Sequence, residues 1–477
     1  MDESLKHTTF KGIIWSSIER FSVQGVSFIV MIIMARILTP KDYGLVGMLT
    51  IFIAIAQSLV DSGFSQALIR KLDRNECDFC TVFYFNIVLS ILLYIILFIS
   101  APLIAKFYNE PILTSLTRVI SFGIIINAFS VVHRAKFNIK LDFKTQTKAS
   151  LSSSLISGVL GIYCAFNGFG VWAIVILQII NQIINVGLLW VLLKWKPKLI
   201  FNLESFKNLF NFGSKIAVGG ILSTIYDNLY LIVIGKVYNP TDVGLYSRAY
   251  QFSTLPSTNI SMIIQRVSYP TLCRLQSNIG ELRRVYNSYY KALALIIFPL
   301  MGLMITIAPN IVEIILGSKW ANVIYPLQIL CLALAFYPSQ GLQINLLNAL
   351  GKSNIYLKID IYKKIIGLLC LIISLPFGLI WLCWGQVIAT QFALFIHMFY
   401  TKKYLDITIL AQIAMLLPAI FSTVIACSTI YIYNNFTQSG IEQLLIDILI
   451  CVLFYSISSC ILNFKEINHL FNLLKNK

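Results

Sequence analysis

The sequence predicts an all-α membrane protein with about fourteen transmembrane helices. Of its 477 residues, 58% are hydrophobic and only 12% are charged, whereas a soluble domain usually carries about 25% charged residues. A chain this apolar cannot cover itself with polar surface, which excludes a soluble globular enzyme and a disordered protein. The apolar residues form continuous runs rather than the alternating pattern of a membrane β-barrel, and this favours helices.

The individual helices are predicted from the requirement that a spanning helix has about 20 mostly apolar residues. The first six runs are 13–35, 44–62, 81–105, 113–132, 149–166 and 170–193. The next six are 216–235, 243–263, 288–308, 323–350, 365–381 and 382–400. A last pair is 407–433 and 441–463. The connections between these runs are short, and several are no longer than a turn.

The basic residues indicate how these helices are oriented. The formal net charge is +17, from 37 Lys and Arg against 20 Asp and Glu, which in a soluble chain would suggest nucleic-acid binding. With the N-terminus inside, however, most of the 37 fall in segments on the inner side and few fall in outer turns, as the positive-inside rule requires. We therefore predict that both termini are cytoplasmic and that the chain binds no nucleic acid.

Neither the cysteines nor the histidines indicate a cofactor. The ten cysteines lie mostly within apolar runs, where we expect them to act as small buried hydrophobic residues. The four histidines are scattered and have no partner at metal-ligand spacing. We predict no metal site and no cofactor, and we leave proton or sodium coupling open.

One segment on the inner side, 199–212, is amphipathic rather than uniformly apolar. Leu203, Phe206 and Leu209 share one helical face, and polar side chains occupy the other. Helices of this kind lie along the lipid headgroups. The sequence therefore predicts an interfacial linker helix at 196–215.

A loop motif recurs at an offset of two hundred residues. The first copy contains Arg36, Pro40, Asp42 and Gly44, and the second contains Lys236, Pro240, Asp242 and Gly244. The two copies are separated by six predicted helices, an even number, so the two halves share one orientation. This is the parallel-repeat layout of alternating-access transporters, and we expect both turns to form part of an outer gate. The alternative is a chance match of turn-forming residues.

These turns and further segments resemble the polysaccharide-transporter branch of the multidrug/oligosaccharidyl-lipid/polysaccharide exporter superfamily. The matching segments are DSGFSQALIRK (61–71), TVFYFNIV (81–88), GFGVWA (168–173), FGSK (212–215), YPLQILCL (325–332) and NALGKS (348–353). Within that branch the chain is similar to the flippases of lipopolysaccharide (O-antigen), capsule and colanic-acid repeat units. The resemblance extends over nearly the whole chain.

The resemblance implies a flippase that moves undecaprenyl-diphosphate-linked oligosaccharide across the bacterial inner (cytoplasmic) membrane for surface polysaccharide synthesis. It also implies two six-helix lobes around a central cavity, followed by an extra helix pair. We accordingly assign an N-terminal lobe to 1–195, a C-terminal lobe to 216–400, and the extra pair with a cytoplasmic tail to 401–477. The expected partners are the lipid-linked oligosaccharide and membrane lipids, and an association with polysaccharide polymerase machinery is left open.

Three arginines inside the apolar runs are candidates for binding the diphosphate. A charge at mid-helix costs about 2.5–3.5 kcal/mol on insertion scales, so such residues are usually functional. Arg20, Arg118 and Arg248 are of this kind, and a guanidinium group matches phosphate oxygens bidentately. The resemblance supports Arg20 and Arg248, because related lipid flippases are thought to use cavity arginines in helices one and eight. The alternative is snorkelling of each side chain to the nearby headgroups.

Asp227 is the leading candidate for ion coupling, and Glu19 and Asp61 are further candidates. A carboxylate in a medium of low dielectric constant can exchange a proton near neutral pH. The alternative for Asp227 is a structural hydrogen bond to a neighbouring hydroxyl group or arginine. Among the polar residues of the apolar runs, Asn181 and Gln182 could line a sugar path, although packing between helices explains them equally well.

Two other functions are weighed against the flippase. A drug/cation antiporter of the same superfamily would need an acidic cavity, and the three membrane arginines argue against one. A polysaccharide polymerase or ligase would need polar outer loops that hold sugars and catalytic groups, and the predicted outer segments are short and carry few charges. We therefore predict a transporter and not an enzyme.

Overall fold

The computed structural model describes the backbone of residues 3–434 and 440–462, and the side chains of these residues except 3–14, 16–17 and 61–62. Within the described backbone the chain forms helices and no strand, which confirms the all-α prediction. It divides into two compact units, Met1–Gly244 and Leu245–Lys477, here called unit 1 and unit 2.

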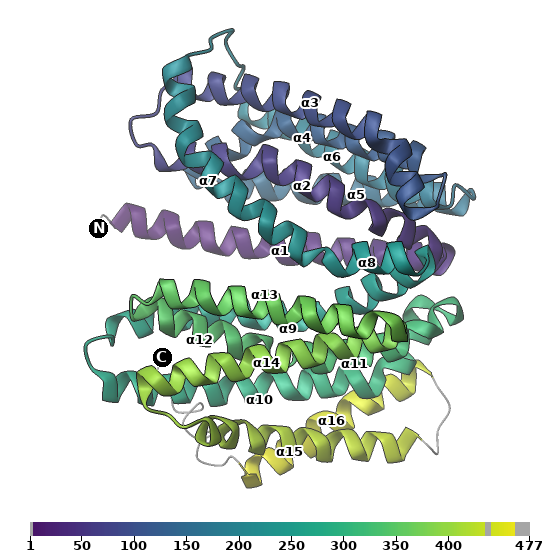
Figure 1. The fold of residues 1–477 in the computed structure, drawn as a ribbon, viewed down its shortest axis with the longest axis vertical. Helices are drawn as coiled ribbons and strands as arrows, with labels where there is room; N and C mark the ends of the chain where they lie inside the picture. The colour runs from purple at the N-terminus through teal and green to yellow at the C-terminus, as the bar shows by residue number, and fades with distance from the viewer. Residues whose placement is uncertain (1–2, 435–439, 463–477) are drawn as a thin grey trace. The chain divides into compact units, whose positions relative to one another are not determined.

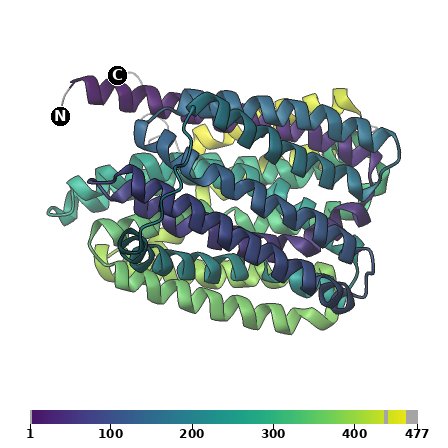
Figure 2. The ribbon, with the colours of Figure 1, turned by 90° about the horizontal axis from the view of Figure 1, so that it is seen from above.

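Unit 1 is a bundle of long helices followed by a bent pair. Its helices are α1 (Glu3–Ile37), α2 (Pro40–Arg70), α3 (Glu76–Tyr108), α4 (Leu113–Lys140), α5 (Phe143–Phe166), α6 (Val171–Leu193), α7 (Leu203–Asp227) and α8 (Leu229–Val237). The main contacts join α3 to α4, α1 to α5, α5 to α6 and α2 to α7. Figures 1 and 2 show these long helices running side by side.

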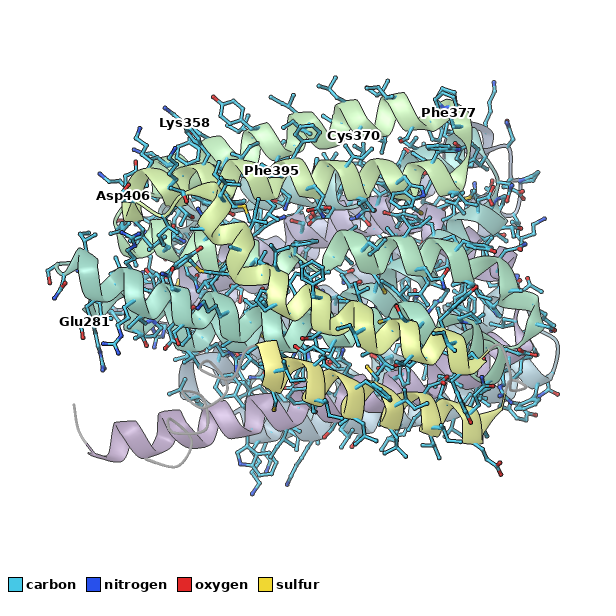
Figure 3. The ribbon with its side chains drawn as sticks, turned by 90° about the horizontal axis from the view of Figure 1, so that it is seen from below. Glu281, Lys358, Cys370, Phe377, Phe395 and Asp406 are labelled. Atoms are coloured by element: carbon cyan, nitrogen blue, oxygen red, sulfur yellow. The ribbon has the colours of Figure 1, made fainter. Side chains whose placement is uncertain are left out.

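Unit 2 holds most of α9 and all later helices. They are α9 (Pro240–Arg274), α10 (Ile279–Ile311), α11 (Ile324–Leu334), α12 (Tyr337–Ala349), α13 (Ser353–Ser374), α14 (Leu379–Leu405), α15 (Ile409–Asn434) and α16 (Ile441–Leu462), with short helices η1 (Val312–Leu316), η2 (Ser318–Val323) and η3 (Leu375–Phe377). In Figure 3 the charged residues Glu281, Lys358 and Asp406 lie at one end of this unit and Phe377 lies at the other.

Every predicted apolar run coincides with a helix or a pair of helices. Eleven helical segments of the described chain are long and apolar enough to cross a membrane, or up to 12 if the bent pair α7–α8 is one span. The helices α9 and α13, which coincide with the predicted runs 243–263 and 365–381, are not among them. The count of fourteen spans therefore stays a prediction.

The buried face of α9 explains why this helix is poor in apolar residues. Ser253, Ser257, Ser261 and Ser268 are all buried on it, at spacings that place them on one side of a helix. The hydroxyl group of Ser257 donates a 2.8 Å hydrogen bond to the carbonyl oxygen of Leu334. Hydrogen bonds of this kind join helices in a membrane, where hydrophobic burial offers little advantage over lipid.

The first turns of α7 include residues 203–215 of the predicted linker, and they continue without a break into the rest of that helix. Two of their apolar side chains, Phe206 and Leu209, pack against α2 and α3, whereas Leu203 is 66% exposed. The ring of Phe206 lies 4.9 Å from that of Phe85 and 6.2 Å from that of Phe64, between ring centroids. Leu209 is buried in the same cluster. The amphipathic face read from the sequence is thus a helix-packing face.

The orientation of unit 2 in the membrane can be tested by cysteine labelling. In a variant without the ten native cysteines, we expect Glu281→Cys and Asp406→Cys to react with a membrane-impermeant maleimide only when the inner face is exposed, because basic residues surround that end. Phe377→Cys, whose side chain is 64% exposed, should react in intact cells. The cysteine-free parent is the control, and the reverse labelling pattern would contradict a cytoplasmic C-terminus.

Candidate functional site

The two copies of the repeated turn lie directly against each other in unit 1. A Cβ atom on Gly44 would overlap the carbonyl oxygen of Pro240, and a Cβ atom on Gly244 would overlap that of Pro40. Each glycine therefore packs on the backbone of the other copy, which is possible only because it has no side chain. The sequence repeat is also a reciprocal contact between the first turns of α2 and α9.

The remaining residues of each motif build the helix start that makes this contact. Thr39 caps α2, because its side chain accepts from the amide of Asp42 while the Asp42 carboxylate accepts from the Thr39 amide. In the second copy Asn239 takes this role, and its Oδ1 atom accepts a 2.9 Å hydrogen bond from the amide of Asp242. Proline at the first helical position suits both helices, since the amide it lacks would have no partner there.

The basic residue of each motif lies at the surface, just before the turn. Lys236 donates a 2.7 Å hydrogen bond from Nζ to the carbonyl oxygen of Phe107, at the end of α3, and lies 4.6 Å from the centre of the Phe107 ring. Arg36 is exposed at the end of α1. The structure thus brings Gly44 against Pro240 and Gly244 against Pro40, and a gating role for the eight predicted turn residues stays a prediction.

A small polar pocket of about 200 Å³ lies within unit 1, between α1, α4, α5 and α6. It is lined by Val23, Asn127, Arg134, Ser150, Ser153, Ser154, Asn181, Gln182, Asn185 and Val186. Pockets that enclose a drug-sized molecule measure about 300–1,000 Å³, so this one has room for a single small polar group. Eight of its ten lining residues are polar, in helices that are otherwise apolar.

Hydrogen bonds connect the polar pocket across three helices. The guanidinium group of Arg134 donates from Nη2 to Oδ1 of Asn185 at 3.1 Å. The Asn185 amide in turn donates to the hydroxyl group of Ser153 at 3.4 Å. The side-chain oxygen of Gln182 is buried and has no hydrogen-bond partner among the described residues. The pocket therefore offers a cation, amides and hydroxyl groups, which suit an anionic or hydroxylated ligand.

Of the residues predicted for substrate and ion binding, Glu19 lies beside this pocket. Its carboxylate accepts a 2.8 Å hydrogen bond from the hydroxyl group of Ser150, one of the lining residues. Arg20 follows it on α1 with an exposed side chain. Arg134 is not among the three predicted arginines, because in the sequence it belongs with the basic residues of the inner side. The serines and amides of 150–154 and 181–185, at helical spacing, are the signal that could have pointed to it.

Arg118 and Arg248 lie in other surroundings. The guanidinium carbon of Arg118 lies 4.4 Å from the centre of the Phe98 ring, on the neighbouring helix α3, a cation–π contact. Arg248 belongs to unit 2 and donates a hydrogen bond to Gln251, one turn further along α9. A shared diphosphate site for the three arginines stays a prediction.

Asp227 is the last residue of α7, where the chain breaks and bends by 44° into α8. It therefore lies at a helix end and not in the middle of one continuous span. Its side chain is exposed. Broken helices of this kind occur at ion and substrate sites of transporters. The side chain of Asp61, in α2, lies outside the described residues.

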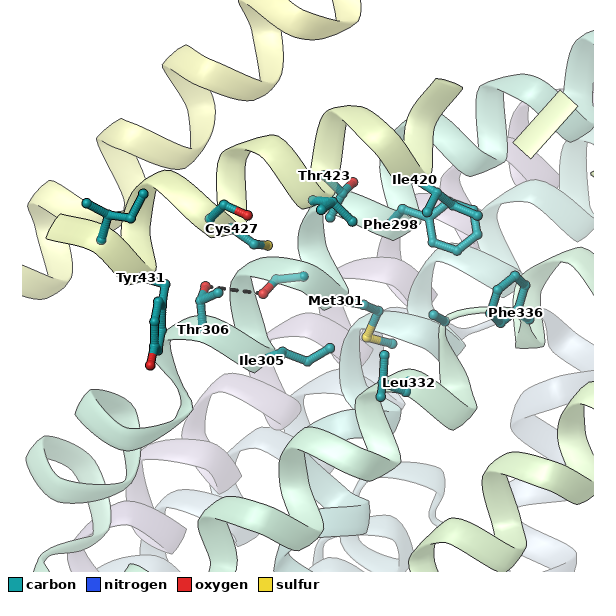
Figure 4. Close-up of a pocket in the computed structure, with 15 residues that line it drawn as sticks. Phe298, Met301, Ile305, Thr306, Leu332, Phe336, Ile420, Thr423, Cys427 and Tyr431 are labelled. Carbon is teal, nitrogen blue, oxygen red and sulfur yellow. Dashed lines mark hydrogen bonds between the residues drawn. The ribbon is translucent and has the colours of Figure 1, made fainter. Parts of the chain in front are cut away.

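Unit 2 contains an apolar cavity of about 490 Å³ between α10, α11 and α15, drawn in Figure 4. Its walls include Phe298, Met301, Leu332 and Phe336, which are hydrophobic. The one hydrogen bond drawn there is internal, from the Thr306 hydroxyl group to a helix carbonyl oxygen. A cavity with so little polar surface accepts hydrocarbon and disfavours sugar or ions.

A site for a transition metal would need several His, Cys, Asp or Glu side chains close together. Within the described parts of the chain, no group of three or more His, Cys, Asp or Glu side chains is arranged to hold a metal ion.

Comparisons of the sequence identify related proteins. The family model described as polysaccharide biosynthesis protein matches residues 33–325. The teichuronic acid biosynthesis protein TuaB of Bacillus subtilis is 26% identical over 332 residues, 69% of this chain and 68% of TuaB. The lipopolysaccharide biosynthesis protein WzxC of Escherichia coli is 25% identical over 379 residues, 78% of this chain and 76% of WzxC. The succinoglycan biosynthesis transport protein ExoT of Rhizobium meliloti is 21% identical over 314 residues, 66% of this chain and 64% of ExoT.

The fold is also similar to solved structures. The lipid II flippase MurJ, in an inward closed conformation, matches with a TM-score of 0.77 and 17% identity over 94% of this chain and 98% of MurJ. An inward-facing multidrug resistance transporter of the MATE family matches with a TM-score of 0.64 and 17% identity over 83% of this chain and 98% of its own. At these identities the likeness shows a common fold.

The glycine contact predicts that the turns tolerate no side chain at Gly44. Gly44→Ala should lower the midpoint of thermal unfolding, because the new methyl group overlaps the Pro240 carbonyl oxygen and overpacking costs about 1–3 kcal/mol. The matched control is Gly25→Ala in α1, where a Cβ atom meets nothing within 4 Å. Equal midpoints for the two variants, measured on detergent-purified protein, would contradict the contact.

Proposed function

Because this chain belongs to the polysaccharide biosynthesis protein family, we propose that it is the flippase of a surface-polysaccharide pathway, and that it moves an undecaprenyl-diphosphate-linked oligosaccharide across the cytoplasmic membrane. Membership in the family confirms the resemblance read from the sequence. The matched relatives and folds include a transport protein, a lipid flippase and multidrug transporters, in agreement with a transporter that is not an enzyme.

The observation that carries the proposal is the presence of two chemically opposite cavities in one membrane chain. The polar pocket of unit 1 carries Arg134, amides and hydroxyl groups. The apolar cavity of unit 2 has hydrocarbon walls and a volume of about 490 Å³. A lipid-linked oligosaccharide has both characters, since its sugars and diphosphate are polar and its polyprenyl chain is hydrocarbon. A purely polar or purely apolar substrate would suit only one of the two cavities.

Alternating access is the transport mechanism that the repeated turns support. Parallel repeats in transporters move relative to each other about a substrate site. In this chain the copies touch through Gly44 and Gly244 with no side chain between them, so the first turns of α2 and α9 can slide or rotate on a backbone-to-backbone contact. We assign these turns to the outer gate.

The roles of the membrane charges follow from the same proposal. We assign Arg20 and Arg248 to the diphosphate, with Arg118 as a third cation nearer the lipid. Glu19, tied to the polar pocket through Ser150, and Asp227, at the break between α7 and α8, are assigned to coupling with a proton or sodium gradient, as is Asp61.

A drug antiporter of the same fold fits the chemistry less well. Cationic drugs need an acidic cavity, whereas the polar pocket of unit 1 has Arg134 in its lining. The likeness to multidrug transporters rests on 17% identity and shows their fold without their substrates.

Charge reversal of Arg248 should slow transport while the protein remains folded in the membrane. Arg248→Glu replaces a cation that attracts diphosphate by an anion that repels it, so we expect at least a tenfold slower transfer of a polyprenyl-diphosphate oligosaccharide between leaflets of proteoliposomes, a change of about 1.4 kcal/mol in the barrier. The control is Lys358→Glu, at an exposed residue near the start of α13. Unchanged transfer by the Arg248 variant would remove its assigned role, and the same assay under proton or sodium gradients identifies the coupling ion.

Filling the apolar cavity should affect substrates according to the length of their lipid. Leu332 lines the cavity and is 41% exposed, so Leu332→Trp adds bulk there without burying it in a tight core. We expect slower transfer of an undecaprenyl-linked substrate and little effect on a short-chain prenyl analogue. Leu368→Trp, an exposed position on α13, is the matched control. An equal effect on both chain lengths would argue against a lipid-binding cavity.

A further inference from the structure

A buried carboxylate that the flippase proposal does not use lies in the last helix of unit 2. Asp447, on α16, is 0% exposed, and Asn310 and Gln443 beside it are 7% and 6% exposed. The Asp447 Oδ2 atom accepts hydrogen bonds from the side-chain amides of Asn310, at 3.2 Å, and Asn434, at 3.3 Å. Gln443 donates to Oδ1 of Asn434 at 2.8 Å. These four residues, from α10, α15 and α16, are called the Asp447 cluster.

Two buried oxygen atoms of the Asp447 cluster accept no hydrogen bond from the described residues. Both amide donors go to Oδ2 of Asp447, and its Oδ1 atom is buried with no hydrogen-bond partner among the described residues. The same holds for Oε1 of Gln443. Gln443 and Asp447 are four residues apart on one helix, so their side chains are neighbours on one face. Two buried acceptors one helical turn apart thus have no donor among the described residues, and leaving them unpaired costs free energy unless a proton or cation binds them.

The charge of Asp447 is also unbalanced. The described part of α15 carries no charged residue. On α10 the nearest basic residue in sequence is Lys291, which precedes Asn310 by roughly 28 Å of helix at about 1.5 Å per residue. After α10 come Glu313 in η1 and Lys319 in η2. The ionisable groups of α15 and α16 other than Asp447 are exposed Glu442 and the neutral thiol and phenol groups of Cys427, Tyr431, Tyr433, Cys451, Tyr455 and Cys460. No cation of the described protein forms an ion pair with Asp447.

We propose that the Asp447 cluster is a binding site for one monovalent cation, a proton or a sodium ion, held by the free oxygens of Asp447 and Gln443. One carboxylate among three neutral carboxamides carries a single negative charge, which one monovalent cation balances. All available ligand atoms are oxygens, which suit a hard cation. Because the cluster joins α10, α15 and α16, its occupant fastens the C-terminal helix pair to the helix that lines the apolar cavity.

This site is independent of the substrate proposed above, so it can be tested on stability alone. The full-length purified protein is unfolded by heat in sodium, in potassium or in a large organic cation, at pH values between about 5 and 9. If sodium is the ligand, the unfolding midpoint should rise by roughly 2–4 °C in sodium alone. If the ligand is a proton, the stabilisation should be present at low pH and be lost as the pH rises and the proton leaves, whatever the salt.

Asp447→Asn should abolish either response, because the amide keeps the shape of the side chain and removes its charge. Glu442→Gln, which removes an exposed carboxylate five residues earlier on the same helix, should keep the response of the unmodified protein. A response that survives in the Asp447 variant, or its absence from the unmodified protein under all conditions, would overturn the proposal.

A measurement without substitutions covers the case in which the variant does not fold. Dicyclohexylcarbodiimide modifies protonated carboxyl groups within membranes, and peptide mass spectrometry locates the adduct. We expect Asp447 of the unmodified protein to react. If sodium is the ligand, sodium should suppress the reaction, and if a proton is the ligand, rising pH should suppress it. Modification that is indifferent to both, or absent, would overturn the proposal.

Discussion

The bilayer interior provides no water for polar groups, and much of the internal structure of this chain follows from that constraint. Helix contacts are made where polar side chains find partners on the neighbouring helix. Ser257 of α9 donates to the carbonyl oxygen of Leu334, the last residue of α11. Gln412 of α15 donates to the carbonyl oxygens of Met398, in α14, and Ile407. Such bonds distinguish protein contact from lipid contact, which hydrophobic burial alone does not.

The same constraint makes incompletely satisfied polar groups informative. Gln182 in the polar pocket of unit 1, and Gln443 and Asp447 in unit 2, keep buried oxygen atoms without a partner in the described protein. A soluble protein could solvate such atoms, whereas a membrane protein retains them at a free-energy cost. A ligand from outside the chain that reached these atoms would therefore add to stability, a polar group in the first case and a cation in the second.

Close backbone contact serves a different purpose. Gly44 and Gly244 pack on the prolines of each other's turn, and Gly63 and Gly213 bring α2 and α7 together in the same way. Without a Cβ atom at these positions, the helices meet backbone to backbone with no interlocking side chains. If the chain works by the proposed alternating access, these backbone contacts are places where its helices could move against each other.

The fold class, the approximate positions of most helices, the repeat and the family follow from the sequence alone, because these depend on hydrophobicity summed over about 20 residues and on short local motifs. It could not show that Asp227 ends a helix, that Arg118 stacks on Phe98, or that Arg134 lines a pocket. Those facts depend on which face each helix turns toward its neighbours. In an almost uniformly apolar helix, the spacing of hydrophobic residues does not show which face that is. Only tertiary packing decided which polar residues meet, and therefore where the chemistry of the protein is located.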